Sequence, residues 1–156
     1  MRILGLDLST TETGWCIYND GIFQVGKIKP KTTDSRNDRI QYTTYNIKEL
    51  VQAFKIDLVI IEDIYLNYAT SAMVLGRLQG AVIYMLKDTF KCEPIFYDCS
   101  HARKNVGLNG HAKKYEVCAF VSKKLNQEII NDNTADAVIV VLNHLKETGV
   151  SCGWSY

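Results

Sequence analysis

The stretch GLDLSTTETGWCIYNDG, residues 5–21, carries an apolar run into a carboxylate and then into a polar turn. Residues 2–8 have the pattern of a buried strand, and Asp7 lies at its end. An ionised carboxylate in an apolar sheet is costly unless a cation compensates its charge. The sequence therefore predicts a metal ion or a basic side chain beside Asp7.

The composition is that of an ordinary globular protein. The chain has 156 residues, 47% of them hydrophobic and 22% charged, which predicts one domain over 1–147 and a tail over 148–156. No apolar run approaches the roughly 18 residues of a membrane span, and we expect neither a signal peptide nor a membrane partner. Five scattered cysteines without zinc-site spacing indicate reduced thiols, and therefore a cytoplasmic protein.

Charge is unevenly distributed along the chain, although the net charge is only +1. The first basic segment, residues 101–126, contains six Lys and Arg residues and one acid. The second basic segment, residues 27–39, contains five Lys and Arg residues and two acids. Each segment is either a phosphate-binding face or ordinary solvated surface.

The predicted elements begin with strands and continue as alternating helices and strands. Expected strands cover 2–8, 14–19, 21–28, 57–63 and 93–98, and expected helices cover 36–54, 71–90, part of 101–125 and 132–147. The second and third strands are joined by Asp20 and Gly21, a strong hairpin signal. This order predicts an α/β fold with a mixed five-stranded sheet flanked by helices.

Four acids fall at the ends of these elements. Asp7 and Glu62 end two predicted central strands, and Asp132 and Asp136 share one face of the last helix. Carboxylates without His or Cys suit a hard cation, Mg²⁺ or Mn²⁺, and such sites often hold two ions. Each acid also has an ordinary structural alternative, such as a turn cap for Asp7, a surface strand end for Glu62 or a helix N-cap for Asp132.

Taken in order, these motifs resemble the RuvC family of Holliday-junction resolvases, within the ribonuclease H-like nuclease superfamily. RILGLDLSTTETGW, LVIIEDIY and DNTADA are similar to the acidic motifs of that family. SAMVLGRLQGAVI is similar to its long dimer-interface helix, and KNVGLNGHAKK to its basic DNA-contacting segment. The resemblance covers residues 1–147 and implies a ribonuclease H-like fold.

The resemblance implies a metal-dependent crossover junction endodeoxyribonuclease that acts as a homodimer on four-way or other branched DNA, in recombination, repair or phage DNA processing. The implied catalytic and metal-binding residues are Asp7, Glu62, Asp132 and Asp136, with two Mg²⁺ or Mn²⁺ ions in each subunit. The implied DNA contacts are Tyr65, Arg103, Lys104, Lys113 and Lys114. The implied location is the bacterial cytoplasm, either for a protein of the bacterium itself or for a phage-encoded protein that acts in its host.

One position departs from the family pattern. The family commonly has Asp or His three residues before its last acid, where this chain has Asn133, and an acid, Asp132, precedes it. The fourth ligand is therefore Asp132 or Asn133, or the site has only three carboxylates, and the charge needed by two cations favours Asp132. The spacing GLNG also differs from the usual Gly-x-Gly, so no base preference is carried over.

Other functions remain open at this stage. A nucleotide-binding ATPase of the actin and sugar-kinase type shares a loop like DLSTTETG, but it needs a second phosphate loop and a second domain. A YqgF-like nuclease of the same fold shares the first acid and the short length, whereas the long helix over 71–90 favours RuvC. A third alternative is a non-catalytic relative that binds junctions without cutting them. Only Asn133, at the position where the family has a ligand, favours it.

Overall fold

The computed structural model describes residues 1–64 and 69–150. Its elements are β1 Arg2–Asp7, β2 Thr13–Asn19, β3 Ile22–Ile28, α1 Arg36–Phe54, β4 Leu58–Glu62, α2 Ala69–Phe90, β5 Ile95–Tyr97, α3 Cys99–Asn105, α4 Lys114–Leu125 and α5 Asp132–Glu147. Every predicted strand and helix is confirmed, and the segment 101–125 contains the end of α3 and all of α4. Most of the predicted tail, from residue 151, lies outside the described residues. Within the described part of the chain, no helix is both long and apolar enough to cross a membrane.

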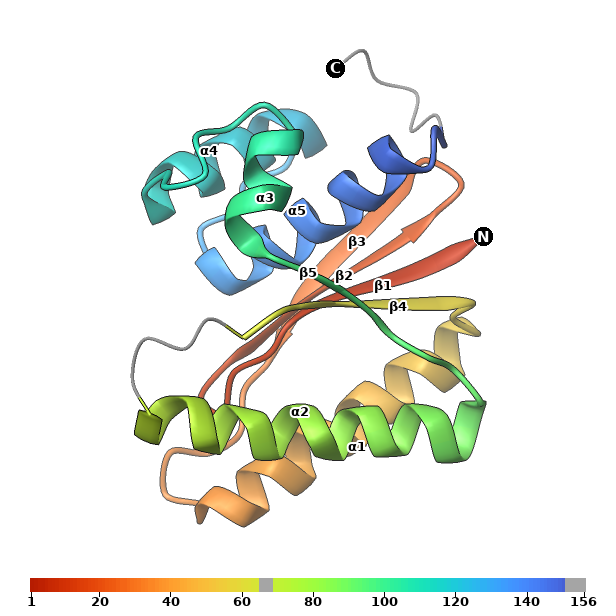
Figure 1. Cartoon of the computed structure of the whole chain (residues 1–156), viewed down its shortest axis with the longest axis vertical. Helices are drawn as coiled ribbons and strands as arrows, with labels where there is room; N and C mark the ends of the chain where they lie inside the picture. The colour runs from red at the N-terminus through yellow and green to blue at the C-terminus, as the bar shows by residue number, and fades with distance from the viewer. Residues whose placement is uncertain (65–68, 151–156) are drawn as a thin grey trace.

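The five strands form one mixed sheet in the order β3-β2-β1-β4-β5. Strands β1, β2 and β3 pair in antiparallel fashion, whereas β4 runs parallel to both β1 and β5. Helices α1 and α2 cover one face of this sheet, and α3, α4 and α5 lie on the other face (Figure 1). The predicted mixed α/β sheet is therefore confirmed.

Strand β1 is the centre of the molecule because both of its faces are covered. Leu4 and Leu6 pack with buried residues of α1 and α2. Ile3, pointing to the other face, packs in a second core with the apolar side of α5. This two-sided burial explains why the first strand is apolar throughout instead of alternating with polar residues.

Two glycines let α5 approach the sheet closely. A Cβ added to Gly5 would lie 2.4 Å from the carbonyl oxygen of Ala137. A Cβ added to Gly14 would lie 2.1 Å from the carbonyl carbon of Asn133. Gly14 is also the antiparallel partner of Asp7. The beginning of α5 therefore rests against the end of β1, where the first predicted acid lies.

Candidate active site

Three acidic side chains meet at one edge of the sheet. Asp7 ends β1 and Glu62 ends the parallel strand β4, so both carboxylates lie at the same edge. Asp136, on α5, is brought to this edge by the close contact between that helix and the sheet. Ligand atoms of Glu62, Asp136 and Cys99 all lie within 4.8 Å of one another. The structure thus brings together three acids that are far apart in the sequence.

These carboxylates repel one another in a poorly solvated place. Burial, followed by the charges of Glu62 and Asp136, raises the pKa of Asp7 well above its usual range. Burial and then the charge of Asp136 raise the pKa of Glu62 to about 7. The Oε2 atom of Glu62 is buried and has no hydrogen-bond partner in the described part of the chain. The cluster therefore carries more negative charge than its surroundings compensate.

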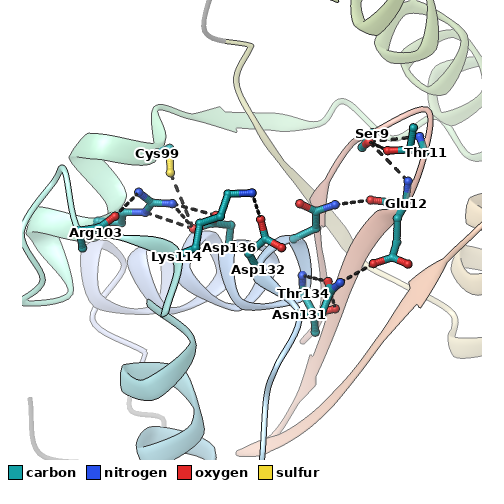
Figure 2. Close-up of polar contacts among 12 residues, drawn as sticks. Ser9, Thr11, Glu12, Cys99, Arg103, Lys114, Asn131, Asp132, Thr134 and Asp136 are labelled. Atoms are coloured by element: carbon teal, nitrogen blue, oxygen red, sulfur yellow. Dashed lines mark hydrogen bonds and ion pairs between the residues drawn. The ribbon is translucent and has the colours of Figure 1, made fainter. Parts of the chain in front are cut away.

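Two cations of the first basic segment reach the acids of α5 (Figure 2). The Nη2 atom of Arg103 donates to both carboxylate oxygens of Asp136 at 2.8 Å, and its Nε atom donates to Oδ1 at 3.2 Å. Lys114 forms an ion pair with Asp132. Among the described residues, no ion pair reaches the carboxylate of Asp7. Of the two partners predicted for Asp7, a metal ion or a basic side chain, the described basic side chains pair with the α5 acids instead.

The residues fit a divalent metal ion. Asp7, Glu62 and Asp136 offer hard oxygen donors, and their mutual repulsion would be relieved by a cation between them. The unpartnered Oε2 atom of Glu62 supplies a free ligand position. This acidic cluster could therefore hold a metal ion of the Mg²⁺ or Mn²⁺ kind.

Cys99 is a site residue that the sequence analysis missed. It is the first residue of α3, and its Sγ atom lies 3.8 Å from Oδ1 of Asp136. Burial and the charges of Glu62 and Asp136 raise the pKa of its thiol well above the usual range, so the sulfur stays protonated in this environment. Its position directly after the predicted strand 93–98, beside the strand of Glu62, was the signal that could have found it.

The structure separates the roles of Asp132 and Asn133. Asn131 is the N-cap of α5, and its side chain accepts the Thr134 N–H at 2.8 Å, so the N-cap alternative for Asp132 is wrong. The Nδ2 atom of Asn133 donates to the backbone carbonyl of Glu12, in the β1–β2 loop. The charge of Asp132 contributes to the raised pKa of Asp7. Asn133 is thus bonded to the loop, and Asp132 is electrostatically part of the cluster.

The predicted DNA contacts have different surroundings. Arg103 and Lys104 line a 680 Å³ cavity beside the acidic cluster, together with Cys99. Lys113 and Lys114 are exposed at the beginning of α4, although Lys114 is paired with Asp132. Tyr65 lies outside the described residues.

Comparison with known proteins identifies the family. The family model described as "Crossover junction endodeoxyribonuclease RuvC" matches residues 3–144. The RuvC proteins of Ehrlichia ruminantium (strain Gardel) and of Sulfurovum sp. (strain NBC37-1) are 26% and 30% identical to this chain, over 93% and 94% of it and 96% of each relative. The structure described as "T. thermophilus RuvC in complex with Holliday junction substrate" has the same fold, with a TM-score of 0.78 at 18% identity over 97% of both chains. The fold is therefore ribonuclease H-like, and the protein belongs to the RuvC family of crossover junction endodeoxyribonucleases.

Proposed function

We propose that this endonuclease cuts four-way DNA junctions at the acidic cluster of Asp7, Glu62 and Asp136. The observation that carries the proposal is a cluster of carboxylates from three elements. Glu62 and Asp136 lie close together, and their charges act on the buried Asp7. The cluster has excess negative charge and a free buried oxygen, and it lies beside a cavity whose lining includes Arg103 and Lys104. Structural acids normally have a partner within the fold, whereas Asp7 has no ion pair in the described part of the chain. A site for metal-dependent phosphodiester hydrolysis explains this charge.

The chain's own residues have distinct parts in this chemistry. Asp7, Glu62 and Asp136 would hold divalent cations, and Asp132 would complete the set with a fourth negative charge. When bound, two such ions supply Lewis acidity that activates a water molecule and stabilises the leaving oxygen. Asn133, bonded to the carbonyl of Glu12, fixes the β1–β2 loop against α5 and so keeps Asp7 facing the helix.

The first basic segment supplies the surface for DNA phosphates. Lys104 is exposed at the cavity beside the acids, and its side chain rests on Gly110, where an added Cβ would lie 2.7 Å from the lysine Cε atom. A lysine held in this way presents its ammonium group to a strand that enters the cavity. Lys104→Ala should therefore weaken junction binding. It should also reduce the steepness of the salt slope, the slope of the logarithm of the binding constant against the logarithm of the salt concentration, by about 0.9. Lys123→Ala, at the far end of α4, should change neither.

Assembly as a homodimer through α2 is the second part of the proposal. Among the described residues, no atom outside the neighbouring turns of α2 lies within 4 Å of a Cβ added to Gly76 or Gly80, so these glycines do not pack on the protein's own sheet. The same helix exposes Met73 at 52% and Tyr84 at 71%. Exposed apolar side chains beside two open glycines suit close contact with another helix. A second copy is the preferred partner because a two-fold dimer offers two equivalent sites to a four-way junction.

Cleavage of synthetic DNA tests the proposed function. A four-way junction, a duplex of the same sequence and an RNA–DNA hybrid are incubated with the protein in Mg²⁺ or in chelator. We expect paired nicks in the junction alone, only with Mg²⁺, and none with Asp7→Asn, which should still bind the junction. Equal cleavage of the duplex, or full cleavage by Asp7→Asn, would contradict the proposal.

The comparisons do not favour the alternatives. The family model that matches residues 3–144 is that of RuvC, which favours neither a nucleotide-binding ATPase nor a YqgF-like nuclease. We also propose that the protein acts in the cytoplasm, because the four described cysteines are free thiols, as in proteins of reducing compartments.

A further inference from the structure

The second basic segment is not used by the function proposed above. Two of its lysines, Lys27 and Lys29, each lie 3.2 Å from the carboxylate of Glu12, so that acid compensates them. Arg36 and Arg39, at the beginning of α1, differ from these lysines. Within residues 1–64 and 69–150, neither arginine side chain makes an ion pair or a hydrogen bond, and the Nε atom of Arg39 is buried without a partner. An uncompensated buried donor of this kind points to a missing acceptor.

Both arginines line a 340 Å³ cavity. Its other walls are the β1–β2 loop and the beginning of α2, and the described lining residues are Leu8, Ser9, Thr10, Thr11, Arg36, Arg39, Val74 and Leu75. No acid is among these residues. Two guanidinium groups and three hydroxyl groups therefore face one cavity, which is the chemistry that binds a phosphate.

The hydroxyl side of the cavity is already ordered. Ser9 Oγ lies 2.9 Å from Thr11 Oγ1 and accepts the Thr11 N–H at 3.2 Å (Figure 2). Because only one of the two hydroxyl hydrogens is needed for the bond between them, the other remains available to a phosphate oxygen. The loop is further fixed by Thr13, whose hydroxyl donates to the Ser9 carbonyl at 2.8 Å. A phosphate would thus meet donors whose positions are set before it binds.

The cavity lies close to the acidic cluster, on the opposite face of the sheet. Ser9 follows Asp7 by two residues, so at most about 7 Å of chain separates their Cα atoms. Helices α1 and α2 cover the face of the sheet opposite α5 (Figure 1). The first basic segment lies on the α5 side, and the cavity lies on the α1 side. A DNA strand at Asp7 would therefore pass between the first basic segment and this cavity.

We propose that this cavity binds a backbone phosphate of the junction through Arg36, Arg39 and the Ser9–Thr11 hydroxyls, as a second DNA contact next to the cut. The inference rests on the proposed function and adds a contact that the first basic segment does not provide. The apolar wall of Leu8, Val74 and Leu75 suits the deoxyribose attached to that phosphate.

Charge-removal variants test this contact. Arg36→Gln and Arg39→Gln are compared with Lys55→Gln, which removes an exposed charge at the far end of the same helix, about 24 Å from Arg39 at 1.5 Å per residue. The dissociation constant for a four-way junction is measured in chelator at several salt concentrations. Each arginine variant should bind more weakly, with a salt slope lower by about 0.9, and Lys55→Gln should match the wild type. Arg39→Lys should keep most of the salt slope because it keeps the charge.

A second arm of the experiment identifies the source of the phosphate. Inorganic phosphate and ATP are titrated into the DNA-free protein by calorimetry. Suppose that the wild type binds phosphate or ATP, that Arg39→Gln does not, and that Arg39→Gln still binds the junction as tightly as the wild type. This result would assign the cavity to a free anion and overturn the inference.

The outcomes separate this inference from the proposed function. A wild-type protein that does not bind the junction would overturn the proposed function itself. Normal wild-type binding, with unchanged affinity and salt slope in both arginine variants, would overturn only the second contact. Melting temperatures accompany each measurement. If Arg39→Gln is unfolded, Arg36→Gln decides the result, because the Arg36 side chain is exposed and its loss leaves the core intact.

Discussion

Replacing Glu62 with Gln should stabilise the metal-free protein while abolishing cleavage. The substitution keeps the shape of the side chain and removes a charge from a cluster that lacks enough cations. Burial, and then the charge of Asp136, raise the pKa of Glu62 from 4.5 to about 7 in the folded state. Between these two pH values the folded protein binds more protons than the unfolded chain, so the free energy of unfolding decreases as the pH rises.

The size of this effect follows from the same pKa. A pKa difference of one corresponds to about 1.4 kcal/mol, so the step from 4.5 to about 7 destabilises the folded protein by about 3 kcal/mol once the pH exceeds 7. Below pH 4.5 the side chain is protonated in both states and costs nothing. The Glu62→Gln variant lacks this loss at every pH. Its advantage over the wild type should therefore grow from less than about 1 kcal/mol near pH 5 to about 3 kcal/mol near pH 8.

Denaturant unfolding in chelator, repeated from pH 5 to pH 8, measures this difference. Comparing the variant with the wild type measures the loss of the Glu62 charge together with the relief that this loss gives to Asp7, whose pKa the charge of Glu62 helps to raise. Glu49→Gln, an exposed substitution on α1, is the matched control and should show no such growth. Adding Mg²⁺ should stabilise the wild type more than Glu62→Gln, because the variant has lost a ligand. A variant less stable than the wild type at pH 8, or an advantage that does not change with pH, would refute the reasoning.

Four further substitutions test the geometry of the site and of the proposed interface. Asp132→Asn should lose most of the cleavage rate with little change in melting temperature, whereas Asn133→Ala should lower the melting temperature and keep most of the rate; the reverse order would make Asn133 the ligand. Gly14→Ala places a Cβ 2.1 Å from the Asn133 carbonyl carbon, so we expect a loss of about 1–3 kcal/mol in denaturant unfolding, and an unchanged stability would contradict the close packing of α5. Gly80→Arg enters open space and should leave the circular dichroism spectrum intact while halving the mass seen by light scattering; an unchanged dimer mass would remove α2 from the interface.

The strand ends of the site were predictable because they depend on local patterns. Asp7 and Glu62 each follow a short apolar run, and parallel strands place their ends at one edge of a sheet. The last helix was equally clear, since a polar start is followed by a long apolar stretch and the structure has the predicted bounds, Asp132–Glu147. Its closeness to the sheet was not predictable from the pattern alone, because it depends on Gly5 and Gly14 facing the helix.

The counterions of the site could not be predicted, because they depend on how a long segment folds back. The sequence shows a cluster of basic residues over 101–126, and such a cluster is as compatible with solvent or DNA as with an acid inside the fold. Only the positions of α3 and α4 against α5 turn Arg103 toward Asp136 and Lys114 toward Asp132. Cys99 was missed for a related reason, since its place after a predicted strand becomes informative only once that strand is known to lie beside the strand of Glu62.

The distribution of counterions follows the way in which each acid is held. Asp7 and Glu62 belong to β1 and β4, strands that pair with neighbours on both sides, so repulsion between their carboxylates cannot move the backbone apart. Asp136 stands on a helix that is held mainly by side-chain packing, and an uncompensated charge there would favour movement of α5 away from the sheet. The ion pair with Arg103 offsets that repulsion. The carboxylates without an ion pair in the described part of the chain are thereby those at the rigid strand ends, where the fold tolerates their charge and a metal ion can use it.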